Sequence, residues 1–123
     1  MTTLLIVDDD RTNRLRLAQM SRFLGYQPML ASDGARALTV LEDNPDIDIV
    51  MTDWQMPVMD GPALIRALRE SGNKVPCLVY SAYRSIQEMT ALLMQGADYF
   101  LPYPVSLEDL SEYVARFRSA QKT

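Results

Sequence analysis

The chain has 123 residues, 48% of them hydrophobic, and 16 acidic against 12 basic residues give it a formal net charge of −4. This length suits one domain over residues 1–123, and the negative charge disfavours direct binding to nucleic acid or to an anionic membrane. The absence of histidine excludes Ser-His-Asp catalysis, histidine ligation of metals and a phosphohistidine carrier. Any chemistry must therefore use carboxylates, hydroxyls and backbone groups.

Strand and helix patterns alternate along the chain. The first, third and fourth of the expected strands contain apolar runs, typical of strands buried on both faces, and the more polar second strand suits the edge of a sheet. The strands are expected at residues 4–7, 27–31, 47–52, 75–80 and 97–101. Helical spacing predicts helices that begin near residues 11, 33, 61, 85 and 106. In the first helix, Leu15, Leu17 and Phe23 are expected on the apolar face.

This alternation predicts an α/β fold, a doubly wound five-stranded parallel sheet with five helices covering its two faces. In such a sheet, ligands bind outside the carboxyl ends of the strands. Polar residues stand at these ends: Asp8, Asp9, Asp10, Asp53 and Ser81. We therefore expect residues that are far apart in the sequence to meet at one rim of the sheet.

Carboxylates that lie close together repel one another unless a cation neutralises them. Mg²⁺ suits one or two carboxylates with a backbone carbonyl and water, whereas Ca²⁺ needs a dedicated loop of oxygen ligands that the chain lacks. We predict that Asp8 and Asp9 bind Mg²⁺ beside Asp53, and that Asp10 mainly caps the following helix. Asp53 is interpreted as a nucleophile that accepts a phosphoryl group. Ser81 would donate a hydrogen bond to that group, or else cap a helix or turn.

Four segments together resemble the receiver domain of two-component response regulators. They are Leu5-Ile6-Val7-Asp8-Asp9-Asp10, Asp53-x-x-Met56-Pro57-x-Met59-Asp60-Gly61, Ser81-Ala82, and Gly96-Ala97-Asp98 followed by Pro104. The likeness covers nearly the whole chain, in order and at matching spacing. It implies a flavodoxin-like sheet of strand order 2-1-3-4-5. It also implies that a sensor histidine kinase or a phosphotransfer protein phosphorylates Asp53.

The resemblance implies further roles at the rim. Asp8, Asp9 and Asp53 would hold Mg²⁺ together with the backbone carbonyl of Gln55. Ser81 would be the switch hydroxyl and Phe100 the switch aromatic, although an ordinary core position also accounts for Phe100. The output protein or domain would contact the fourth helix, fifth strand and fifth helix. Such a domain catalyses only its own phosphotransfer and dephosphorylation, so we do not expect an enzyme that acts on a separate substrate.

One position departs from the family pattern. Receiver domains carry a lysine immediately before the proline that corresponds to Pro104, and this chain has Tyr103 there. The lysine would pair with Asp53 and then with the phosphoryl group, whereas a tyrosine offers at most one neutral hydrogen bond. The loss could weaken phosphorylation or its coupling to the switch roughly ten- to a hundredfold. Arg84, near Ser81, is a candidate to compensate, while nothing in the sequence places Lys74 at the site.

Two functions follow from these observations. The first is a phosphorylation-dependent signalling switch, and the alternative, suggested by Tyr103, is a degenerate receiver that docks proteins independently of phosphorylation. A small phosphatase built on Asp8-Asp9-Asp10 is a weaker hypothesis, because it leaves Asp53 without a role. No apolar run is long enough to cross a membrane, and the amino terminus lacks the features of a secretion signal. We therefore expect a cytoplasmic location.

Overall fold

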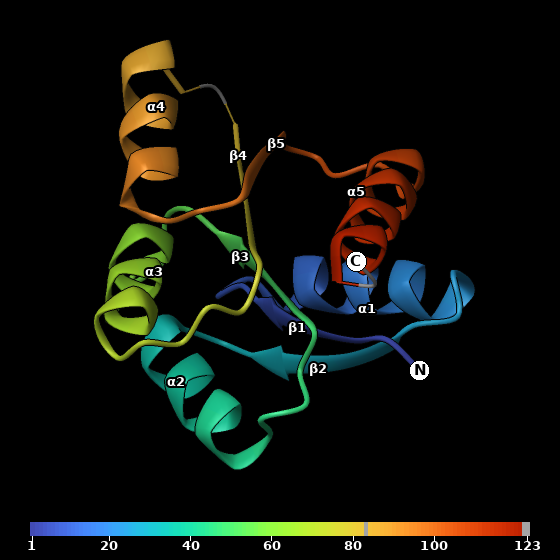
Figure 1. Ribbon diagram of the computed structural model, residues 1–123. Helices are drawn as coiled ribbons and strands as arrows, with labels where there is room; N and C mark the ends of the chain where they lie inside the picture. The colour runs from blue at the N-terminus through green and yellow to red at the C-terminus, as the bar shows by residue number, and fades with distance from the viewer. Residues whose placement is uncertain (83, 122–123) are drawn as a thin grey trace.

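Five parallel strands form the central sheet of the computed structural model, which describes residues 1–82 and 84–121 (Figure 1). The strands are β1 Thr3–Val7, β2 Gln27–Ala31, β3 Ile49–Asp53, β4 Cys77–Ser81 and β5 Tyr99–Pro102. Their order across the sheet is β2-β1-β3-β4-β5, and every neighbouring pair is parallel. The predicted doubly wound α/β fold is confirmed, and so is the strand order that the resemblance implied.

Helices cover both faces of this sheet (Figure 1). They are α1 Arg11–Phe23, α2 Gly34–Asp43, α3 Gly61–Glu70, α4 Ile86–Gln95 and α5 Leu107–Gln121. Side chains alternate along each strand, so Leu4 and Ile6 pack with α1 and α5 while Leu5 and Val7 pack with the other three helices. The sheet therefore separates two apolar cores. Among the described residues, none of the helices has the length and apolar character that crossing a bilayer requires.

Polar side chains cap the helices that follow the strands. Asp10 and Asp60 each accept a hydrogen bond from a backbone amide in the first turn of α1 and α3, respectively. Ser85 and Glu88 form a reciprocal capping box at the start of α4. The capping role expected for Asp10 is confirmed. These caps fix where the loops at the carboxyl rim end, and hence the space that those loops enclose.

Two details of the predicted elements are wrong. The third, fourth and fifth strands each begin two residues later than predicted, at Ile49, Cys77 and Tyr99. Apolar residues in the preceding loops pack against a core without joining the sheet, so hydrophobicity alone does not mark a strand's start. Leu15 and Phe23 are not buried on α1 but are 45% and 79% exposed. The buried stripe of this helix is narrower than its apolar content suggests.

The loop between β3 and α3 packs closely against the end of β3. The Gly61 amide donates a hydrogen bond to the Trp54 carbonyl at 2.9 Å. A Cβ atom at Gly61 would lie 2.5 Å from the backbone carbonyl oxygen of Asp53, which is closer than van der Waals contact allows. Glycine is therefore needed here for close backbone approach, and this approach fixes the backbone that carries Asp53.

We predict that Gly61→Ala lowers the free energy of unfolding by about 1 to 3 kcal/mol, because the added methyl group forces the Asp53 backbone to move. Urea denaturation measures the loss. Gly25→Ala is the control, since Gly25 has φ +85 but no heavy atom within 4 Å of a Cβ there. That change should cost only about 1 kcal/mol, through backbone strain. A smaller loss for Gly61→Ala than for Gly25→Ala would contradict the close approach.

Candidate functional site

Three aspartates meet at the carboxyl ends of β1 and β3. Asp8 and Asp9 follow β1 directly, and Asp53 is the last residue of β3. One carboxylate oxygen from each residue lies within 4.8 Å of the other two. The two strands are neighbours in register, so their ends bring the acids side by side. The structure thus assembles the acidic cluster that the sequence predicts at this rim.

Asp8 is buried and is held by donors from three directions. Its carboxylate accepts hydrogen bonds from the Asp10 amide at 2.9 Å, from the Asn13 side chain, and from the Tyr80 hydroxyl at 2.6 Å. Burial, followed by the charge of Asp8, raises the pKa of Tyr80, so the hydroxyl keeps the proton that it donates. Together these donors hold the Asp8 carboxylate in a fixed orientation.

The sequence does not predict Asn13 or Tyr80 as site residues. A usable signal exists for each, because both are polar groups at positions where the pattern calls for an apolar residue. Asn13 lies on the buried side of α1, and Tyr80 is fully buried in β4 among aliphatic neighbours. Buried polar groups need partners, so such residues point to a polar group nearby. Only the folded structure shows that this group is the Asp8 carboxylate.

Asp53 has an unusually high pKa for an aspartate. Burial, followed by the charge of Asp8, raises the pKa of Asp53 from 3.8 to about 6, although backbone hydrogen bonds from Gln55 and Trp54 act in the opposite direction. The cause is physical crowding, because a half-buried carboxylate beside other carboxylates is poorly solvated. Three hard oxygen donors within this span fit Mg²⁺, which prefers carboxylates together with carbonyls and water.

The predicted switch residues Ser81 and Phe100 lie on the strands beyond β3. Ser81 ends β4 and is 8% exposed, and its hydroxyl accepts a hydrogen bond from Nε of Arg84 at 3.1 Å. It does not cap α4, because Ser85 occupies that position. Phe100, in β5, is half-buried and packs edge-on against Trp54, with 6.0 Å between the ring centres. It therefore contacts the residue that follows Asp53.

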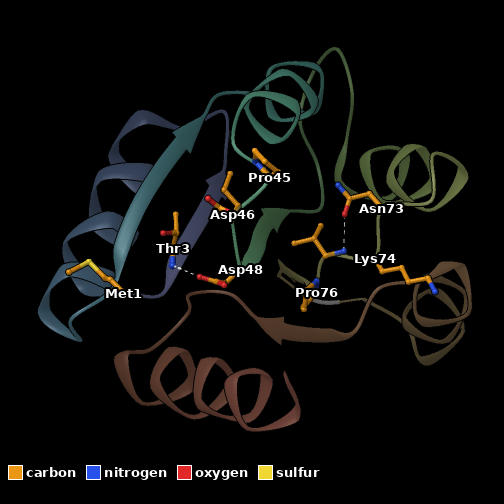
Figure 2. A pocket seen from close by; sticks show the side chains of 10 residues that line it. Met1, Thr3, Pro45, Asp46, Asp48, Asn73, Lys74 and Pro76 are labelled. Carbon is orange, nitrogen blue, oxygen red and sulfur yellow. Dashed lines mark hydrogen bonds between the residues drawn. The ribbon is translucent and has the colours of Figure 1, made fainter. Parts of the chain in front are cut away.

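Tyr103 and Lys74 lie at opposite ends of the strands. Tyr103 follows β5 at the carboxyl rim, where its amide donates to the Ser81 carbonyl at 2.7 Å and its side chain is 50% exposed. A cis peptide bond joins it to Pro104. Lys74 precedes β4 and lines a hollow at the amino ends of the strands, together with Asp48 (Figure 2). Lys74 is thus too far away to supply the charge that Tyr103 lacks.

Comparisons with known proteins extend over most of the chain. A family model described as the response regulator receiver domain matches residues 4–115. Response regulator MprA of Mycobacterium sp. (strain KMS) is 42% identical over 116 residues, which are 94% of this chain but 49% of that protein. The chain therefore spans about half the length of the curated relatives that it matches.

Solved structures show the same architecture. The receiver domain of Francisella response regulator 1452 superposes with a TM-score of 0.90 at 27% identity, covering 98% of this chain and 99% of that one. A probable two-component system response regulator/GGDEF domain protein gives a TM-score of 0.92 at 33% identity, covering 100% of this chain and 51% of that one. The similarity is a property of the whole fold and does not depend on the acidic rim alone, meaning the end of the sheet that carries Asp8, Asp9 and Asp53.

We predict that Asp53→Asn stabilises the metal-free protein at pH 7.5. The gain should be only on the order of 1 kcal/mol, because water screens the half-buried carboxylate. The carboxyl of Asp53 has its pKa raised to about 6, so it favours the folded state when protonated, and that contribution is lost as the pH rises through 6. The gain from the amide should therefore be full above pH 6 and vanish below pH 3.8.

Thermal unfolding in EDTA across this pH range measures the effect. Asp33→Asn is the matched control, because Asp33 caps α2 and asparagine caps a helix about as well. The control should show no comparable gain at pH 7.5. A gain for Asp53→Asn that is the same at pH 4 and pH 7.5 would show that charge repulsion is not its cause.

Proposed function

The chain belongs to the response regulator receiver family, whose members act as phosphorylation-dependent signalling switches, and we propose that Asp53 is its phosphoacceptor. The observation that carries the proposal is the position of Asp53 at the end of the central strand, with two further carboxylates within 4.8 Å. Parallel α/β sheets bind ligands outside the carboxyl ends of their strands. Asp53 combines that position with partial exposure, which a phosphodonor needs.

The proposed reaction is phosphoryl transfer from a phosphohistidine on a sensor histidine kinase or a phosphotransfer protein. A carboxylate oxygen of Asp53 bonds to phosphorus while the P–N bond breaks, and the departing imidazole takes up a proton and leaves neutral. The hydroxyl of Ser81 donates a hydrogen bond to an oxygen of the transferred group. Water later hydrolyses the acyl phosphate. The domain thus acts only on itself and converts no separate substrate.

Mg²⁺ is the cofactor that fits the donors at this rim. We assign its protein ligands to Asp8, Asp9, Asp53 and the backbone carbonyl of Gln55, all of which are hard oxygen donors. When bound, Mg²⁺ would neutralise charge on the phosphoryl oxygens and orient them. The contribution of the chain is to orient the Asp8 carboxylate, since Asp10, Asn13 and Tyr80 donate hydrogen bonds to it.

The output surface is assigned to α4, β5 and α5. Ile86 and Met94 on α4 are 79% and 84% exposed, which is unusual for large apolar side chains and suits a surface that binds a partner. Phe100 in β5 is the proposed switch aromatic, because its contact with Trp54 links this surface to the residue after Asp53. The recipient is another protein or a further domain, since the matched relatives are about twice as long. A cytoplasmic location fits such a partner.

We predict that the wild-type chain with Mg²⁺ and acetyl phosphate gains one phosphoryl group, detected by intact-mass spectrometry, and that Asp53→Asn gains none. Asp60→Asn is the matched control, because Asp60 caps α3 nearby and an asparagine cap preserves the helix. If Asp53→Asn gains a phosphoryl group to the same extent as the wild type, the phosphoacceptor is a residue other than Asp53. If the wild type binds Mg²⁺ but accepts no phosphoryl group from any donor, phosphorylation-independent docking becomes the better function.

We predict that Tyr103→Lys increases the extent of phosphorylation or the lifetime of the phosphorylated state roughly tenfold or more. The new ammonium would form a charge-assisted hydrogen bond with the phosphoryl group, and such bonds contribute about 1.5 to 3 kcal/mol. Phosphate-affinity gels over a time course measure both quantities. Tyr103→Phe separates the gain of charge from the loss of the tyrosine hydroxyl. An unchanged time course for Tyr103→Lys would mean that this position does not face the phosphoryl group.

A further inference from the structure

Arg84 is held at the edge of the acidic rim by three different contacts. Its Nε donates to Oγ of Ser81 at 3.1 Å, and its guanidinium carbon lies 4.5 Å from the centre of the Trp54 ring. Nη1 forms an ion pair with Glu88 at 3.2 Å. The side chain is only 19% exposed. An arginine fixed in this way, between the residue after Asp53 and the end of β4, is not an ordinary solvated surface charge.

We propose that Arg84 is a positioning residue that supplies, through Ser81, the positive charge that Tyr103 cannot supply. The proposal rests on the assignment of Asp53 as phosphoacceptor. A serine hydroxyl has one hydrogen to donate and two lone pairs that accept. Because Ser81 accepts from Arg84, its own hydrogen remains available for an oxygen of the phosphoryl group on Asp53. The guanidinium charge polarises the hydroxyl and strengthens the bond that it donates.

The location of Arg84 distinguishes it from Arg14, a basic side chain that also donates a hydrogen bond close to the three aspartates. Arg14 donates from Nη1 to the backbone carbonyl of Asp8 at 2.8 Å. That contact lies on the β2 side of the cluster, where Arg14 lines a shallow hollow with Ala31. Arg84 instead bonds the hydroxyl proposed to bind the phosphoryl group. The geometry therefore favours Arg84 as the cation that acts on the phosphorylated state.

The test measures binding of beryllium fluoride, a phosphoryl mimic, to the Mg²⁺-loaded chain by isothermal titration calorimetry. Arg84→Gln should weaken binding about tenfold, the lower end of what a charge-assisted hydrogen bond contributes. Arg84→Lys should recover part of this loss, because it restores the charge. Affinity for Mg²⁺ alone should not fall in either variant, since Arg84 contacts none of the proposed metal ligands. A merely structural role would weaken both affinities together.

The matched control is Arg116→Gln. Arg116 makes the same kinds of contact on α5, an ion pair with Glu112 at 2.7 Å and a stacking contact 5.3 Å from the Tyr113 ring centre. Its loss should leave beryllium fluoride binding unchanged. If Arg116→Gln weakens binding as much as Arg84→Gln does, a general loss of charge explains both results and the inference is overturned.

A double-mutant cycle tests whether Arg84 acts through Ser81. In the Ser81→Ala background, Arg84→Gln should change beryllium fluoride affinity less than about twofold, because the hydroxyl that relays the charge is gone. A full tenfold effect in that background would overturn the relay. Equal affinities of the wild type and Arg84→Gln would overturn the inference while leaving Asp53 as phosphoacceptor. Failure of the Mg²⁺-loaded wild type to bind beryllium fluoride would overturn both.

Discussion

The structure depends on three carboxylates that the fold forces together. Asp8, Asp9 and Asp53 have oxygens within 4.8 Å of one another because β1 and β3 are adjacent and end at the same level. Burial, followed by the charge of Asp8, raises the pKa of Asp53. Three donors hold the Asp8 carboxylate, whereas the backbone hydrogen bonds from Gln55 and Trp54 to Asp53 do not offset its raised pKa. Added positive charge would therefore stabilise this cluster, and either a bound cation or a nearby basic side chain would supply it.

The chain differs from its family in where a basic side chain can meet this requirement. Tyr103 follows β5 and has no charge to offer, whereas Arg84 follows β4 and reaches the rim through Ser81. A charge that acts through a neutral hydroxyl is farther from the phosphoryl group than a direct ammonium would be, and Coulomb interactions weaken with distance. The relay therefore compensates for only part of the missing lysine. It also ties the phosphorylated state to the loop that begins α4 rather than to the loop after β5.

The sequence predicts the fold well because apolar runs and helical spacing are local signals, and the geometry of parallel sheets then gathers Asp8, Asp53 and Ser81 at one rim. It fails where side chains meet across the fold. The hydrogen bond from Tyr80 to Asp8 joins residues 72 positions apart, and no local pattern indicates it. It also overestimates burial on α1, where Phe23 is exposed, because an apolar residue at helical spacing faces the core only if a neighbouring element covers it.

The position of Arg84 suggests how charge at Asp53 would reach the output surface. In α4 only Leu92 is buried, so few apolar contacts hold this helix against the sheet. Its first turn depends on Glu88, which caps the helix with Ser85 and also pairs with Arg84. A phosphoryl group that accepts a hydrogen bond from Ser81 would strengthen the contact of Arg84 with Ser81 relative to its contact with Glu88. Because the helix is weakly packed, a change of about 1 kcal/mol in its first turn is enough to alter its position or order. Signalling then requires no large movement of the sheet.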